Sequence, residues 1–282
     1  MSNPTLPPSS SNALYGGAIH RRITVKDIQK SKSIERWPML TAYEQYTAEI
    51  FDKCGIPVLL VGDSAASNFL GYENTIPVTV DELIPLARAV VRSTKRAMVV
   101  ADLPFGSYES SPEQALATAT RFMKESGVQA VKLEGGERVV PQIRALVAAG
   151  IPVMAHIGLT PQSLHQLGGY RVQGRGADGA LLIDSAQAVQ DAGAFAVVLE
   201  LIPAELATQI TALLKIPTVG IGAGKECDAQ VLVWSDLMGL TENPPKLAKV
   251  YRNLRQEITN GVNEWAQDVA NGNFPGEAQT FK

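Results

Sequence analysis

Ionisable side chains stand at or just after the ends of five successive apolar runs of the sequence. An acid in this position usually caps a helix or forms a turn, and a single histidine is more often structural than catalytic. Five such endings in succession are too regular for capping alone and favour a functional cluster. The five residues are Asp63, Asp102, Glu134, His156 and Glu200, and Lys132 lies two positions before Glu134.

The types of these side chains narrow the chemistry. Asp63, Asp102 and Glu134 offer hard oxygen ligands of the kind that Mg²⁺ prefers, whereas a zinc site would use more histidine or cysteine. Lys132 and His156 can donate hydrogen bonds to a carboxylate or to a developing oxyanion. The set therefore predicts a magnesium site that binds an anionic substrate.

Glu200 is the candidate base. It interrupts an otherwise apolar run, residues 194–202, where an unpaired buried carboxylate is costly. A carboxylate on a separate strand is free to move the proton on the carbon next to a carbonyl, while a metal holds the carboxylate and keto oxygens of the substrate. Together these residues predict the enolisation of a 2-oxo acid.

Eight short apolar runs must position these side chains, and each is apolar on both alternating faces, as in strands buried on both sides of a parallel sheet. Helix signals separate them, such as the capping box from Thr79 to Glu82, which opens a helix to about Ser93. This order predicts a single (β/α)8 TIM barrel with the polar residues at one mouth. A doubly wound open sheet is the alternative, but it lacks a GxGxxG turn. The runs are 38–42, 57–61, 97–101, 129–133, 152–156, 196–200, 217–221 and 230–234.

The two ends of the chain are expected to lie outside the barrel strands. Residues 1–22, rich in Ser, Asn and Pro at their start, predict a flexible N-terminal arm. Residues 23–282 predict a single barrel domain that includes C-terminal helices. The C-terminal segment is expected to form one or two amphipathic helices, about 245–260 and 262–270, that pack outside the barrel or against a partner subunit.

Composition excludes several classes of function. The 282 residues are 45% hydrophobic and 19% charged, and 25 basic against 28 acidic residues give a net charge of −3. This balance provides no basic field for nucleic acid or an anionic membrane surface, and no run is long enough to span a bilayer. Two distant cysteines, Cys54 and Cys227, form no CxxC pair, so two buried free thiols and a reducing cytoplasm are expected. GxSxG, HExxH and P-loop motifs are missing from the sequence.

Seven motifs, in order between about residues 35 and 240, resemble the ketopantoate hydroxymethyltransferase family. Several of them together are highly specific. They are MLTAY at 39–43, VGDS at 61–64, ADLPFGS at 101–107, VKLEGG at 131–136, HIGLTPQS at 156–163, GGYRVQGR at 168–175 and VGIGAG at 219–224.

The resemblance implies a phosphoenolpyruvate/pyruvate-type barrel that transfers a hydroxymethyl unit from 5,10-methylenetetrahydrofolate to 3-methyl-2-oxobutanoate. The product is 2-dehydropantoate, on the way to pantothenate, and Mg²⁺ is the metal. The resemblance also implies a homo-oligomer, often a homodecamer. By position it assigns Asp63, Asp102 and Glu134 to the metal, Asp63, Ser64, Asp102 and Lys132 to the ketoacid, His156 to the pocket and Glu200 to proton transfer.

Two other functions remain open at this point. A Mg²⁺-dependent lyase or mutase of the phosphoenolpyruvate/pyruvate type shares acids at its strand ends, but it generally relies on a loop cysteine, and neither Cys54 nor Cys227 lies in a matching motif. A catalytically silent barrel that serves as a binding module is the second. The retained acids, lysine and Glu200 argue against it.

Overall fold

The computed structural model describes residues 13–17 and 20–281. By its internal contacts the chain divides into two compact units, Met1–Leu232 and Val233–Lys282. This division differs from the predicted single domain over 23–282, because the C-terminal helices form a unit of their own.

The first unit is a closed barrel of eight parallel strands in sequence order. β1 pairs with both β2 and β8, so the sheet has no edge and the open-sheet alternative is excluded. The predicted runs match the strands to within about two residues. The strands are β1 Trp37–Thr41, β2 Val58–Val61, β3 Met98–Asp102, β4 Ala130–Glu134, β5 Val153–Gly158, β6 Ala196–Glu200, β7 Thr218–Ile221 and β8 Ala229–Leu232.

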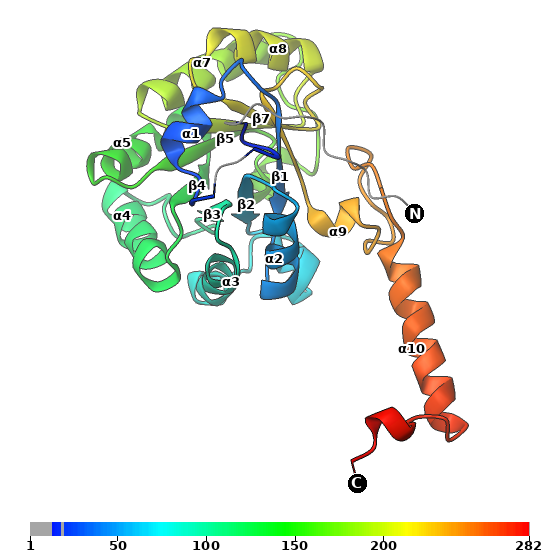
Figure 1. Ribbon diagram of the computed structural model, residues 1–282. Coiled ribbons are helices and arrows are strands. Elements are labelled where there is room, and N and C mark those ends of the chain that lie inside the picture. Colours follow the sequence, from blue (N-terminus) through cyan, green and yellow to red (C-terminus); the bar gives the residue numbers. More distant parts are fainter. Residues whose placement is uncertain (1–12, 18–19, 282) are drawn as a thin grey trace. The chain divides into compact units, whose positions relative to one another are not determined.

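Helices surround this ring of strands, which lies at the centre of the first unit (Figure 1). The capping box from Thr79 to Glu82 is present at the start of the helix that ends at Ser93. Ser111 caps the next helix, which continues as a wider helical turn to Ser126, before Gly127. The helices of this unit are α1 Val25–Lys30, α2 Gln45–Lys53, α3 Val80–Ser93, α4 Pro112–Arg121, α5 Val140–Ala148, α6 Leu164–Leu167, α7 Asp178–Asp191 and α8 Ala204–Leu213.

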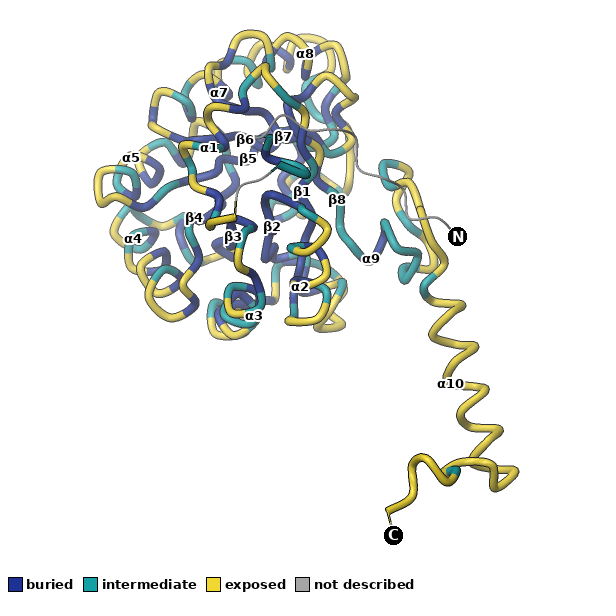
Figure 2. The backbone as a smooth tube through the Cα atoms, in the orientation of Figure 1, coloured by how far each residue is buried: buried dark blue, intermediate teal, exposed yellow. Residues whose placement is uncertain are grey.

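The strands are buried on both faces, which explains their continuous apolar character (Figure 2). Side chains two positions apart lie on the same face of a strand. Met98 and Val100 belong to the core cluster inside the barrel, and Asp102 is the next residue on that face. Met154 precedes His156 in the same way on β5. The alternation that fills the barrel with apolar side chains therefore carries these polar ones to its C-terminal mouth.

Part of the predicted N-terminal arm packs on the barrel. Leu14 is buried, and its backbone N–H donates to the Glu35 carboxylate at 3.0 Å. The Arg22 guanidinium donates to the carbonyl oxygens of Thr94 at 2.6 Å and Ala97 at 2.5 Å. The flexibility predicted for residues 1–12 and 18–19 concerns positions outside the described residues.

The second unit contains two helices, α9 Trp234–Leu237 and α10 Leu254–Ala270. Of the one or two helices predicted between 245 and 270, the structure has one, which starts later than predicted and runs through Gly261. It begins at Leu254, where the Asn253 side chain accepts the Gln256 N–H. A glycine inside a helix costs only about 1 kcal/mol relative to alanine, so Gly261 does not end it.

Candidate active site

The barrel brings the predicted strand-end residues together. In the register of the parallel strands, Asp102 lies beside Lys132 and Glu134 lies beside His156. Glu200 is the last residue of β6. The side chains of Lys132, Glu134 and His156 are almost wholly buried, whereas Glu200 keeps 15% of its side chain exposed. Glu200 is therefore the acid at the accessible border of the cluster.

Lys132 lies among the carboxylates. Its Nζ is 2.7 Å from Asp102 Oδ1 and 3.8 Å from Glu134 Oε1. Burial alone would lower the pKa of Lys132, but the surrounding carboxylates raise it overall. The ammonium group therefore stays charged at neutral pH and available to an anionic ligand.

His156 bridges two acids from different strands. Its Nδ1 is 3.3 Å from Glu134 Oε1, and its Nε2 is 3.2 Å from Glu200 Oε2. Burial and Lys132 lower the pKa of His156, but Glu134 and Glu200 raise it to about 9 overall. The ring is therefore an imidazolium at neutral pH, in position to hold the Glu200 carboxylate and to exchange a proton with it.

Two residues that the sequence analysis missed complete the cluster. The Gln162 side chain donates to Asp63 Oδ2 at 2.9 Å, and its backbone N–H donates to Glu134 Oε2 at 3.1 Å. Tyr108 donates its hydroxyl to Gln162 Oε1 at 2.6 Å. Both are buried loop residues that end no apolar run, so strand-end reasoning could not find them. Gln162 lies within the 156–163 motif and Tyr108 directly follows the 101–107 motif, which was the signal that could have found them.

Backbone geometry fixes the end of β6. Leu201 follows Glu200 with a φ of 44°, in the left-handed region that a branched side chain rarely adopts. Its N–H donates to the Ile221 carbonyl at 2.9 Å. The Glu200 carbonyl accepts the Leu159 N–H at 2.8 Å. The strained turn begins directly after the candidate base, a place where strain is typically retained for function.

The comparison with known proteins identifies the family. The model of the ketopantoate hydroxymethyltransferase family matches residues 22–277. The chain is 61% identical over 274 residues to 3-methyl-2-oxobutanoate hydroxymethyltransferase of Streptomyces avermitilis, covering 96% of this chain and 95% of that protein. It is 58% identical to the Thermobifida fusca protein of the same name, covering 95% and 97%. The chain belongs to the ketopantoate hydroxymethyltransferase family. It is a hydroxymethyltransferase enzyme.

The barrel of this family member is shared with more distant proteins. It resembles 2,3-dimethylmalate lyase with a TM-score of 0.58 at 17% identity, covering 92% of each chain. Phosphonopyruvate hydrolase gives a TM-score of 0.60 at 13% identity, also covering 92% of each chain. These likenesses confirm the predicted (β/α)8 barrel fold. Cys54 is exposed, contrary to the expectation of a buried thiol, and Cys227 is buried.

The side chains at the mouth fit a divalent cation by charge. Burial and repulsion from Asp102 and Glu134 raise the pKa of Asp63 well above its ordinary value, and burial raises that of Asp102. The cluster thus holds more buried carboxylate than Lys132 and His156 can neutralise.

The arrangement of the carboxylate oxygens favours a metal site to which the protein supplies only some of the ligands. Mg²⁺ commonly takes one or two carboxylates and fills its other positions with water or substrate, which suits Asp63 and Asp102. Both oxygens of Glu134 already face His156 and the Gln162 N–H. In the described part of the chain, no three His, Cys, Asp or Glu side chains are arranged to hold an ion alone.

The same mouth also contains Ser64, directly after Asp63. The Ser64 Oγ lies 2.9 Å from the Tyr43 hydroxyl. A Cβ at the preceding Gly62 would come within 2.7 Å of that oxygen and 3.2 Å of Asp102 Oδ2, so a larger residue there would displace the Ser64 hydroxyl.

The helices that the structure describes are too short or too polar to cross a membrane.

Proposed function

We propose that this enzyme transfers the one-carbon unit of 5,10-methylenetetrahydrofolate to 3-methyl-2-oxobutanoate, giving 2-dehydropantoate for pantothenate synthesis. The observation that carries the proposal is the buried ionic cluster, in which Lys132 touches Asp102 and His156 touches Glu200. The names of the relatives support the ketoacid as substrate. With water, the balanced reaction yields 2-dehydropantoate and tetrahydrofolate.

Binding of the ketoacid is assigned to the inner part of the cluster. Mg²⁺, when bound at Asp63 and Asp102, would act as a Lewis acid for the carboxylate and keto oxygens. Glu134 is retained as the third predicted metal acid; its oxygens face His156 and the Gln162 N–H, as those of Asp102 face Lys132 and the Asp63 N–H. Lys132 donates to the substrate carboxylate or to the oxyanion that forms.

Proton transfer is assigned to Glu200. Its carboxylate takes the proton from C3 of the ketoacid, and the enolate carbon then forms a bond with the methylene carbon of the folate. Both carbon–nitrogen bonds of that methylene break, one as the carbon–carbon bond forms and one as a water supplies the hydroxyl group. The two nitrogens take up two protons, one that comes from C3 and one from the water. His156, as an imidazolium, holds the Glu200 carboxylate in place at 3.2 Å.

The reaction itself is tested with purified enzyme, the ketoacid and the folate donor. We expect 2-dehydropantoate and tetrahydrofolate in equal amounts, and loss of both when EDTA removes the metal. Glyoxylate formed from an isocitrate-like substrate, without hydroxymethyl transfer, would contradict the proposal and favour the lyase class.

The metal assignment has its own test by calorimetry. Asp102→Asn should abolish Mg²⁺-dependent binding of the ketoacid. Asp191→Asn, at the exposed end of α7, serves as the matched control and should bind as the wild type does. Unchanged affinity in the Asp102 variant would remove Asp102 from the metal site.

The remaining expectations concern assembly and location. We propose a homo-oligomer, with ten subunits as the family resemblance implies, in the cytoplasm. The proposal includes no nucleic-acid or membrane partner. Light scattering of the full chain would contradict the assembly if it gave the mass of one subunit.

A further inference from the structure

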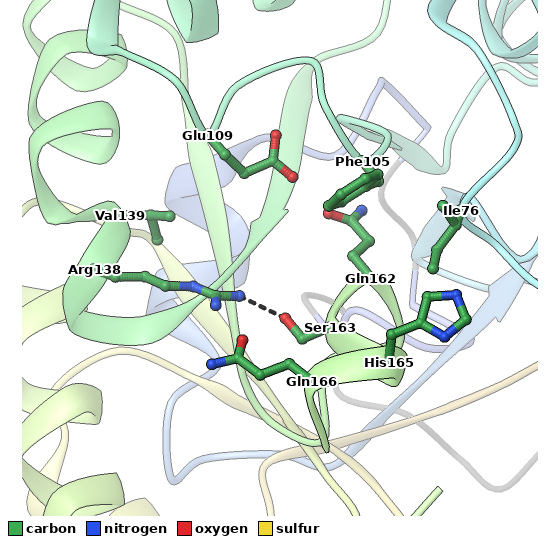
Figure 3. A pocket seen from close by; sticks show the side chains of 9 residues that line it. All are labelled: Ile76, Phe105, Glu109, Arg138, Val139, Gln162, Ser163, His165 and Gln166. Carbon is green, nitrogen blue, oxygen red and sulfur yellow. Dashed lines mark hydrogen bonds between the residues drawn. The ribbon is translucent and has the colours of Figure 1, made fainter. Parts of the chain in front are cut away.

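A pocket of about 450 Å³ opens beside the ionic cluster (Figure 3). Its walls come from the loops that follow β3, β4 and β5, together with Ile76. Glu109 and Arg138 point into it, and Phe105 and Gln162 lie across from them. The pocket therefore combines an acidic side chain, a cationic side chain and an aromatic ring.

Gln162 joins this pocket to the cluster. Its side chain lines the pocket and donates to Asp63 at 2.9 Å, a residue that we assign to the metal and the ketoacid. A ligand in the pocket thus lies one residue away from the ketoacid site. The pocket is therefore next to the place where a second substrate must enter to meet the ketoacid.

The size of the pocket does not suit the ketoacid. The ketoacid has eight non-hydrogen atoms, and even at the ~30 Å³ that a water takes in the liquid they fill only about 240 Å³. A cavity of 450 Å³ is in the range of pockets that hold larger organic ligands. The pocket is therefore built for the bulkier of the two reactants.

We propose that this pocket binds the reduced pterin and glutamate parts of the one-carbon donor. The inference rests on the proposed function, which supplies the folate as the second substrate. A reduced pterin presents an aminopyrimidinone edge with two neighbouring N–H donors, which matches a carboxylate. Its flat ring system matches an aromatic and aliphatic wall such as Phe105 and Ile76.

Glu109 accepts the N–H donors of the pterin edge. Its loop already holds the carboxylate in place, because Oε1 accepts the Gly106 N–H at 3.1 Å and Oε2 accepts the Tyr108 N–H at 3.2 Å. Each carboxylate oxygen has two acceptor sites, so both can accept one further bond. The carboxylate is preorganised rather than mobile.

Arg138 binds the carboxylate of the glutamate tail. Its Nη2 donates to Ser163 Oγ at 2.7 Å, which orients the guanidinium and uses one of its five N–H donors. Arg138 is exposed at the rim of the pocket. A charged tail that reaches the solvent side is consistent with a pterin ring placed near Gln162 and the ketoacid.

Two alternative one-carbon donors distinguish the role of Glu109 from that of Arg138. One is 5,10-methylenetetrahydrofolate, and the other is the corresponding tetrahydropteroate, which lacks the glutamate. With the Mg²⁺ enzyme at saturating ketoacid, Arg138→Met should raise KM for the folate about tenfold, the loss expected for a charge-assisted hydrogen bond. It should leave KM for the pteroate within about twofold. Arg138→Lys, which keeps the charge, should restore most of the folate affinity.

Glu109→Gln should instead raise KM for both donors about tenfold, because both carry the pterin edge. The matched controls are Arg144→Met and Glu137→Gln, whose exposed side chains do not line the pocket. Both controls should keep the wild-type KM for both donors. Circular dichroism confirms that each variant is folded.

Unchanged donor KM in folded Arg138 and Glu109 variants would overturn the pocket assignment. Equal effects of Arg138→Met on both donors would overturn the assignment of the tail to Arg138. Deuterium exchange at C3 of the ketoacid, without any folate, reports the proposed function separately. If the wild-type enzyme shows no such exchange, the proposed function fails; if it shows exchange while the pocket variants keep their donor KM, only the pocket assignment fails.

Discussion

Gln162 is the residue that ties the acids of the site to one another. The side-chain nitrogen of Gln162 donates to Asp63, and its side-chain oxygen accepts the Tyr108 hydroxyl. The backbone N–H of the same residue donates to Glu134. The side-chain nitrogen also donates to the Leu103 carbonyl at 3.0 Å. Substitution can remove these three side-chain contacts but not the backbone one. Because Gln162 touches the acids rather than the ketoacid in our assignment, we regard it as a positioning residue.

Gln162→Met keeps the size of the side chain but removes all three side-chain hydrogen bonds. We expect a loss of about 1–3 kcal/mol in the free energy of unfolding, since buried polar groups of Asp63 and Tyr108 lose a partner. We also expect Mg²⁺-dependent ketoacid affinity to fall about tenfold, because Asp63 is no longer held. Calorimetry and urea unfolding measure the two effects, with the exposed Gln166→Met as control. Lost stability with unchanged ketoacid affinity would show a structural role only.

At this scale the sequence analysis could predict the acids but not their partners. Asp102 and Glu200 each end an apolar run, and a barrel must gather such endings at one mouth. Gln162 and Tyr108 come from loops, whose path depends on tertiary contacts that no local pattern encodes. The family resemblance assigned roles that the strand endings alone left open, such as that of Ser64.

Among the elements, the pairing of β5 with β6 decides where the candidate base lies. Gly158 is the last residue of β5 and lies beside Glu200 in the register. It has a φ of 92°, and a Cβ there would lie 2.3 Å from the Glu200 carbonyl oxygen. The strand bounds were predictable from apolar runs, but this close approach was not, because it depends on the register of two strands 40 residues apart.

Gly158→Ala should displace the end of β6 and with it Glu200. We expect kcat to fall at least about tenfold, together with a loss of about 2–4 kcal/mol in the free energy of unfolding. Gly168→Ala is the matched control, since its φ is also positive, at 66°, but no atom lies within 4 Å of its added Cβ. That control should cost about 1–2 kcal/mol of backbone strain and leave kcat nearly unchanged. An equal fall in kcat for both variants would refute the positional argument.

For the whole molecule, closure of the barrel depends on a buried ion pair at the opposite end from the site. Asp228, just before β8, accepts hydrogen bonds from Lys32 Nζ and from the Thr218 N–H of β7, both at 2.8 Å. Eight apolar runs were enough to predict a closed barrel. They did not reveal this closure contact or the buried Leu14, because both depend on segments distant in sequence.

Asp228→Asn should destabilise the enzyme in a pH-dependent manner. Although burial works against it, the hydrogen bonds from Lys32, Thr218 and Ser33 lower the pKa of Asp228 below its usual value. The stability that the carboxylate contributes is therefore present above the unfolded pKa of about 3.9 and is lost as the pH falls through the folded pKa.

We expect the variant to lose about 2–4 kcal/mol at pH 7, and the difference from wild type to shrink progressively below about pH 4. Urea unfolding at several pH values measures this. Glu226→Gln, which breaks the exposed pair with Arg36, should cost less than about 1 kcal/mol. A difference between wild type and the Asp228 variant that stays constant down to pH 3 would contradict the assignment.

The central claim is that Glu200 abstracts the C3 proton of a ketoacid held by the rest of the cluster, and deuterium exchange tests it most directly. The measurement follows loss of the C3 proton of 3-methyl-2-oxobutanoate by NMR in deuterated buffer with Mg²⁺ and no folate. The wild-type enzyme should catalyse the exchange, and Glu200→Gln should slow it by about 10²–10⁴-fold while the ketoacid still binds. Exchange at the wild-type rate in the variant would contradict the account and move the base to another group.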